Sequence, residues 1–141
     1  MVIMAGSQNI IPMLAYENGV KALEWLVEVF GFTEKEKFVG EDGTLHHGEI
    51  ELDGGTVMLA TPTPDYESPK THSQHCEKMK LWTQVPWVID GVLVYVEDLQ
   101  SHFDHVKASG AKILSEIETN EPGARYRVED LEGHRWFFFQ K

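Results

Sequence analysis

Hydrophobic residues recur along this chain either at helical spacing or in the alternation typical of strands. The same order of helical and strand-like segments occurs twice. From Asn18 to Gly31 apolar residues recur at helical spacing, with Asn18 placed as an N-cap and Gly31 as a C-cap. Alternating or short apolar runs before and after this segment predict strands. The first half is therefore expected to hold one helix and four strands, at residues 10–16, 34–39, 45–52 and 57–61.

The second half repeats this order. A helical pattern runs from Asp98 to Gly110, and strands are predicted at 92–96, 112–116, 126–129 and 135–140. The turn glycines match as well, because Gly31 and Gly54 are 23 residues apart and so are Gly110 and Gly133. Repetition at a fixed offset of 79 residues indicates one supersecondary unit used twice.

These elements predict an α+β fold of two tandem βαβββ modules, with a curled mixed sheet around a pocket and helices outside. The expected boundaries are residues 1–61 for the first module and 88–141 for the second, within one structural domain. Residues 62–87 are polar and proline-containing, and we expect a linker or a lid there, partly packed over an apolar surface.

The amino-acid composition of the chain disfavours some classes of binding partner. The formal net charge of −11 disfavours nucleic acid and anionic lipid, both of which require clustered Lys and Arg. No apolar run has the length of a membrane span, and the first residues lack the basic start of a signal peptide. Cys76 is the single cysteine, so an intrachain disulfide is impossible. We expect a cytoplasmic protein that binds neither nucleic acid nor membrane.

Several short sequence segments indicate a resemblance to a known family. The chain resembles the vicinal oxygen chelate superfamily, which includes glyoxalases, bleomycin-resistance proteins and extradiol dioxygenases. The segments that carry the resemblance are Ala22-Leu23-Glu24-Trp25-Leu26, Phe30-Gly31-Phe32, Val94-Tyr95-Val96-Glu97-Asp98, Ser109-Gly110-Ala111-Lys112 and the run from Glu129 to Trp136. The resemblance implies modules that enclose a pocket and a chain that forms a homodimer.

The resemblance also gives positions for metal ligands. Metal-dependent members place a His, Gln or Glu on the first and last strand of each module, and the matching positions here are Ile11, Met58, Gly91 and Phe137. None of these side chains binds a divalent ion of the hard or borderline class. We therefore expect no metal at the usual site, no cofactor, and no standard metal-dependent catalysis.

Strand alternation predicts which residues line the pocket instead. If Val92 and Val94 face the helix, Tyr95 faces the pocket, and in the last strand alternate residues do so. The 79-residue offset superposes Tyr126 on His47. The expected ligand-binding residues are Met58, Tyr95, Tyr126, Arg135, Phe137 and Phe139, a mixture suited to a small aromatic or planar molecule.

His47 and Glu49 are the candidate catalytic residues. Two positions apart on a strand, they share a face, so the carboxylate could orient the imidazole as a general base, or both could bind an atypical metal. Polar alternation of this kind more often marks only the solvent-exposed side of a strand, and that interpretation stays open here.

Three functions fit this sequence. The first is a protein that sequesters a small planar molecule in a metal-free pocket. The second is a glyoxalase- or lyase-type enzyme that uses His47 and Glu49 or a non-standard metal site. The third is a structural or regulatory dimer with a vestigial pocket. We favour the first, because it accounts for both the missing ligands and the aromatic pocket.

Overall fold

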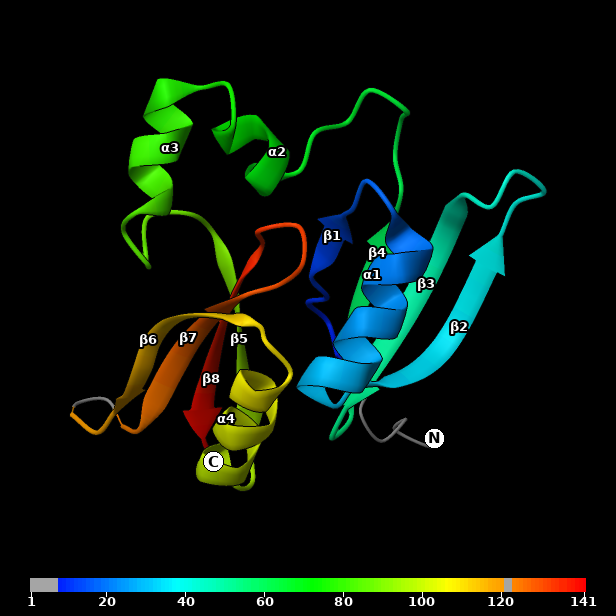
Figure 1. Ribbon diagram of the computed structural model, residues 1–141. Coiled ribbons are helices and arrows are strands. Elements are labelled where there is room, and N and C mark those ends of the chain that lie inside the picture. Colours follow the sequence, from blue (N-terminus) through cyan, green and yellow to red (C-terminus); the bar gives the residue numbers. More distant parts are fainter. Residues whose placement is uncertain (1–7, 121–122) are drawn as a thin grey trace. The chain divides into compact units, whose positions relative to one another are not determined.

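The computed structural model describes residues 8–120 and 123–141. The chain divides after Tyr66 into two compact units. Each unit contains a four-stranded mixed sheet with one long helix against it (Figure 1). The expected α+β fold of two βαβββ modules is confirmed.

The first unit contains one sheet in the order β1-β4-β3-β2. Strands β1 and β4 are parallel, and the other pairs are antiparallel. A π-helical turn at Leu26–Phe30 continues the helix α1. The bounds are β1 Met13–Ala15, α1 Gly19–Trp25, β2 Thr33–Val39, β3 Leu45–Leu52 and β4 Gly55–Ala60.

Caps and packing explain the position of α1. The Asn18 side chain accepts a hydrogen bond from the backbone N–H of Lys21 at 3.1 Å, and Gly31 ends the helical segment with φ of 87°. Leu23 lies over Gly48 of β3, where a Cβ atom would come within 2.9 Å of the leucine Cδ1. Glycine at position 48 therefore allows this close approach of helix and sheet without displacing the leucine side chain.

The second unit contains a sheet in the order β5-β8-β7-β6, again with one parallel pair, β5 and β8. Asp98 caps α4 through the backbone N–H of Ser101 at 3.1 Å. The bounds are α2 Pro69–Ser73, α3 Glu77–Thr83, β5 Gly91–Val96, α4 Leu99–Ala108, β6 Lys112–Glu118, β7 Arg125–Glu129 and β8 Arg135–Gln140.

Aromatic side chains form the core beneath α4. Phe103 of the helix lies edge-on to Tyr126 with 5.0 Å between ring centres, and Tyr126 is stacked on Phe138 at 5.5 Å. All three side chains are buried. Aromatic pairs of this geometry add to the hydrophobic free energy of burial, so this layer fixes α4 on the sheet.

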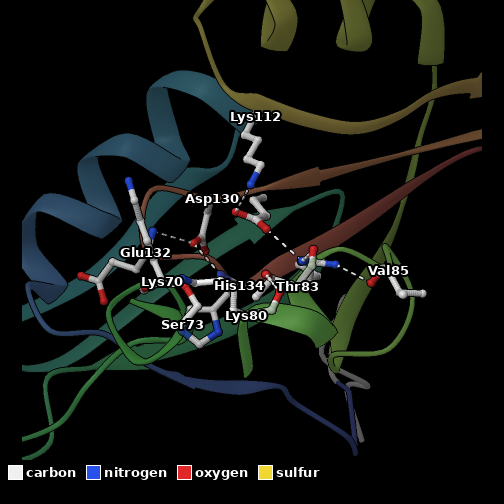
Figure 2. Close-up of polar contacts among 11 residues, drawn as sticks. Lys70, Ser73, Lys80, Thr83, Val85, Lys112, Asp130, Glu132 and His134 are labelled. Atoms are coloured by element: carbon white, nitrogen blue, oxygen red, sulfur yellow. Dashed lines mark hydrogen bonds and ion pairs between the residues drawn. The ribbon is translucent and has the colours of Figure 1, made fainter. Parts of the chain in front are cut away.

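Residues 62–87, expected to be a linker or lid, contain the two short helices α2 and α3. The backbone N–H of Lys70 donates to the Glu132 carbonyl at 3.0 Å, which ties α2 to the turn between β7 and β8. This turn depends on Asp130, whose carboxylate accepts hydrogen bonds from the backbone N–H groups of Glu132 and His134 (Figure 2). The same carboxylate accepts a hydrogen bond from the Trp136 indole.

Within the described ranges, no helix combines the length and the hydropathy needed to cross a membrane.

The Asp130 contacts generate a stability prediction. Asp130→Ala leaves three donors without this acceptor in a buried turn, so we expect a loss of about 3 kcal/mol in the free energy of unfolding. Urea denaturation measures it. Asp90→Ala, at an exposed aspartate of the same unit, is the matched control and should change stability by less than about 0.5 kcal/mol. Equal effects of the two substitutions would contradict the assigned role of Asp130.

Candidate functional site

The face of the first sheet away from α1 carries a cluster of ionisable side chains. His47 and Glu49 lie on β3, with the imidazole Nε2 2.7 Å from a Glu49 carboxylate oxygen. Glu36 lies directly opposite Glu49 on β2. One potential ligand atom from each of Glu36, His47 and Glu49 lies within 4.8 Å of the other two. We call these three residues the Glu–His–Glu cluster.

An irregularity in β2 brings Glu36 into this cluster. Glu34 pairs with Ile50, and a regular ladder would then place Lys35 opposite Glu49. The register shifts between Glu34 and Glu36, and Glu36 takes that position instead. A β-bulge of this kind redirects side chains, because one extra residue inverts the faces of those that follow it.

The pKa values of the two carboxyl groups in the cluster shift in opposite directions. The pKa of Glu36 is raised, first because its carboxyl shares a hydrogen bond with Glu49 and second because the Glu49 charge repels ionisation. The pKa of Glu49 is lowered, because its carboxylate accepts hydrogen bonds from His47 and then from Glu36. Glu49 is therefore the carboxylate that holds the imidazole in place.

A small pocket adjoins this cluster. Its volume is about 120 Å³, and it lies within the first unit. Both histidines of β3 border it, together with apolar side chains of β1 and β4. The lining residues are Met13, Leu14, His46, His47, Met58, Leu59 and Ala60.

The face of the second sheet away from α4 is aromatic. Alternation places Leu93 and Tyr95 of β5 on it, and their register partners Phe137 and Phe139 lie beside them on β8. Leu93 and Tyr95 keep 47% and 55% of their surface exposed. We call these four residues the aromatic face.

Two arginines of β7 lie on this face. Arg127 pairs with Phe137 and Arg125 with Phe139 across the ladder. The Arg127 guanidinium lies 5.4 Å from the ring centre of Trp87 and 5.8 Å from that of Phe137. Both arginines also bind Glu118, at 3.0 Å and 3.4 Å. The surface thus offers planar aromatic and planar cationic groups side by side.

Comparison with known proteins identifies the family. Residues 12–138 match the model of the Glyoxalase/Bleomycin resistance protein/Dioxygenase superfamily. The chain belongs to this superfamily.

Solved structures and sequence relatives agree with this assignment. TioX from Micromonospora sp. ML1 is 30% identical, with 95% of this chain and 96% of TioX covered at a TM-score of 0.69. TnmS3, an antibiotic binding protein from Streptomyces sp. CB03234, shares the fold at 17% identity and a TM-score of 0.67, with 98% of each chain covered. The uncharacterized protein Mb0911c of Mycobacterium bovis is 26% identical over 89% of this chain and 78% of its own length.

At the positions that the family resemblance gives for metal ligands, the side chains offer no oxygen or nitrogen donor. Met58 offers only a thioether, and Ile11 offers no donor atom. At Gly91 a Cβ atom would lie 3.1 Å from two atoms of the Phe137 ring and 3.0 Å from the Arg135 carbonyl oxygen. A side chain at position 91 would therefore require the Phe137 ring to shift by a few tenths of an ångström.

The sequence-based expectation that Tyr126 lies on the same face as the ligand-binding candidates is wrong. Its side chain is buried beneath α4, where its hydroxyl hydrogen-bonds with His102 Nδ1 at 2.7 Å, and burial raises the pKa of the phenol. The cause is the connection between β7 and β8: five residues separate the paired Glu129 and Arg135, whereas four separate the corresponding pair Glu51 and Thr56 of the first unit. Register therefore makes Arg125 and Arg127 the counterparts of His47 and Glu49.

Arg135, also expected among the ligand-binding residues, makes buried contacts within the second unit. It begins β8 on the aromatic side, but its side chain is fully buried. The guanidinium pairs with Glu129 at 2.9 Å and donates to the carbonyl oxygens of Thr83 and Val85 (Figure 2). Its contacts hold the end of α3 and the following residues against the second sheet, so Arg135 is a structural anchor here.

The remaining candidates lie on two surfaces. Met58 adjoins His47 and Glu49 in the first unit, while Tyr95, Phe137 and Phe139 form most of the aromatic face of the second. Sequence reasoning missed Glu36, Arg125, Arg127 and Trp87 as members of these surfaces. Cross-strand pairing could have suggested the arginines only if the exact register had been known.

The Glu–His–Glu cluster generates a prediction about ionisation. His47→Phe keeps a ring but removes the nitrogen that stabilises the Glu49 charge, so the pKa of Glu49 should rise. Carboxyl-detected NMR titration measures this shift. His46→Phe, at the next residue of β3, is the control and should leave Glu49 unchanged. An unaltered Glu49 titration in His47→Phe would contradict the assigned hydrogen bond.

The buried arginine generates a second prediction. Arg135→Met leaves the Glu129 carboxylate without its guanidinium partner, and we expect a loss of about 3–5 kcal/mol in unfolding free energy. The double variant Glu129→Leu with Arg135→Met removes both charges and should recover most of that loss. Denaturant unfolding of both variants is the measurement. A stable Arg135→Met protein would contradict the anchor role.

Proposed function

We propose that this protein binds a small planar organic molecule on the aromatic face, without a metal at the positions that metal-dependent superfamily members use. The ligand would lie against Tyr95, Phe137 and Phe139, beside the guanidinium of Arg127. This role is sequestration or carriage of a compound rather than its chemical conversion.

The observation that carries the proposal is the exposure of the aromatic face. Soluble chains seldom leave large apolar side chains grouped on a surface unless that surface binds something. Here Tyr95 and Leu93 are about half exposed, and Trp87 is 65% exposed beside Arg127. Rings and guanidinium planes both stack on flat ligands, and each stacked aromatic pair contributes about 0.5–1.5 kcal/mol beyond burial.

Local charge on this face differs from that of the whole chain. The net charge of −11 would attract cations at long range. On the aromatic face itself, Arg125 and Arg127 present two guanidinium groups, and both pair with the carboxylate of Glu118. Beside these two guanidinium groups, a planar ligand that is neutral or carries a carboxylate is favoured over a cation.

The similarity to TnmS3 supports a binding role. That neighbour is an antibiotic binding protein with the same fold. A scaffold that binds an antibiotic in one member can present a flat ligand site in another, although the fold does not fix the ligand.

A second candidate function is a glyoxalase- or lyase-type enzyme, favoured by the 2.7 Å contact between His47 and Glu49. A carboxylate-oriented imidazole at a pocket edge is a suitable general base. An enzyme would convert its ligand and lose this turnover in His47→Ala. A binding protein would return the ligand unchanged, as mass spectrometry of the released compound would show.

The homodimer and the cytoplasmic location expected from the sequence stay predictions. Light scattering coupled to size-exclusion chromatography tests the first, and fractionation of cells that express the protein tests the second.

Binding to the aromatic face is testable with matched planar probes. NMR titrations with 2-naphthoate, 2-naphthol and 2-naphthylmethylammonium should shift the ring signals of Tyr95 and Phe137, with the cation binding most weakly. Tyr95→Ala and Phe137→Ala should each weaken binding roughly tenfold, because about 1.4 kcal/mol of stacking and burial is lost. EDTA treatment should leave the affinities unchanged.

Leu81→Ala is the matched control, since Leu81 is a 60% exposed apolar residue on α3. It should bind each probe as the parent chain does. Shifts spread over the surface without a change in Tyr95→Ala or Phe137→Ala would refute this site. A chain that self-associates through these residues and excludes the probes would favour the dimer interpretation instead.

A further inference from the structure

The Glu–His–Glu cluster combines three potential metal ligands on two adjacent strands of the first unit. The side chains come from β2 and β3, and their ligand atoms lie within 4.8 Å of one another. We propose that Glu36, His47 and Glu49 form a binding site for a divalent transition-metal cation, Zn²⁺ foremost. This proposal does not depend on the aromatic face, which belongs to the other unit.

The spacing of the ligand atoms suits such an ion. Bonds of about 2.0–2.2 Å in tetrahedral geometry place ligand atoms about 3.4 Å apart. The His47 and Glu49 atoms are already 2.7 Å apart, and no two of the three ligand atoms are more than 4.8 Å apart. Small side-chain rotations therefore convert the hydrogen-bonded arrangement into a coordinating one, with no movement of the backbone.

The bulge in β2 is the observation that sets this cluster apart from a chance group of surface charges. A regular ladder would place the cation of Lys35 opposite Glu49 and give a favourable cross-strand pair. The register shift places Glu36 there instead, and like charges directly opposite each other are destabilising. A bound cation removes this repulsion and turns an unfavourable pairing into two ligands.

Ligand type indicates which ion fits. Two carboxylate oxygens and one imidazole nitrogen suit Zn²⁺, Mn²⁺, Fe²⁺ or Ni²⁺ better than Mg²⁺ or Ca²⁺, which prefer oxygen alone. Among common ions Zn²⁺ combines high affinity with tolerance of three protein ligands and an open position. Partial exposure of all three side chains leaves a path for the ion and room for water or a further ligand.

The open position would lie near the small pocket. His47 belongs both to the cluster and to the lining of the pocket of about 120 Å³, and Met13 and Met58 also border that pocket. A ligand of a few heavy atoms with an oxygen donor could therefore reach the metal from the pocket. The site differs from the superfamily's metal positions, which lie on the first and last strands of each module.

Metal retention by the full chain tests the proposal. The purified protein is incubated with Zn²⁺, desalted and analysed by inductively coupled plasma mass spectrometry, and one equivalent per chain is expected. Glu36→Gln, His47→Gln and Glu49→Gln should each weaken Zn²⁺ binding at least tenfold in calorimetric titrations. Loss of an outer-shell partner alone costs roughly 10–100-fold, so loss of a direct ligand should cost no less.

Two controls separate this site from adventitious histidine binding. His46→Gln changes the neighbouring residue of β3, and the double variant His72→Gln with His75→Gln removes a histidine pair of the second unit whose ring centres are 5.8 Å apart. Both controls should retain the metal. Glu36 is exposed, so Glu36→Gln should fold normally, and its thermal unfolding curve checks this.

Substitution by Co²⁺ adds a readout of geometry. Visible absorption of the Co²⁺ protein should report a low-coordinate nitrogen and oxygen site, and Glu49→Gln should abolish that spectrum. Failure to retain Zn²⁺, or retention that survives Glu36→Gln and Glu49→Gln but not the His72 and His75 double variant, would overturn the proposal. Probe binding by the aromatic face would be unaffected by either result.

Discussion

The alternation of side chains along β-strands governs this structure more than any single contact does. Each sheet has one helix against it, so one side of every strand is committed to the core and the other is available for chemistry. Leu23 over Gly48 in one unit and Phe103 against Tyr126 in the other set which side is which. The residues on each functional surface are therefore set by the alternation of side chains between the two faces of a strand. A shift of one residue in register exchanges a core residue for a surface residue.

Two such shifts give the halves of the repeat their different surfaces. In the first unit a bulge at Lys35 brings Glu36 opposite Glu49 and makes the surface acidic. In the second, the longer turn before β8 brings Arg125 and Arg127 outward and places Tyr126 inside. Where one sheet carries His47 and Glu49, the other carries two arginines. The duplicated elements thus present an acidic surface on one sheet and a surface of aromatic rings and guanidinium groups on the other.

The same alternation explains how much of the fold and of the candidate site can be predicted from the sequence. Helix ends marked by Asn18, Gly31, Asp98 and Gly110, and the order of the strands, follow from local chemistry, and the fold agrees with them. The contact between His47 and Glu49 also follows from spacing within one strand. Glu36, Arg127 and the burial of Arg135 do not, since each depends on pairing between segments far apart in sequence. A bulge and a one-residue change in a turn leave no mark in hydrophobic periodicity.

The packing of Phe137 on Gly91 has a consequence for substitutions at either position. A histidine or glutamate introduced at Gly91 would place its Cβ atom 3.1 Å from the aromatic ring and 3.0 Å from the Arg135 carbonyl oxygen, so the neighbouring groups would have to shift slightly. Reducing Phe137 first would open the space but remove a ring from the exposed aromatic surface. A substitution at Gly91 is therefore accommodated only if the Phe137 ring gives way. The glycine and the phenylalanine are coupled positions, because a change at one alters the space available to the other.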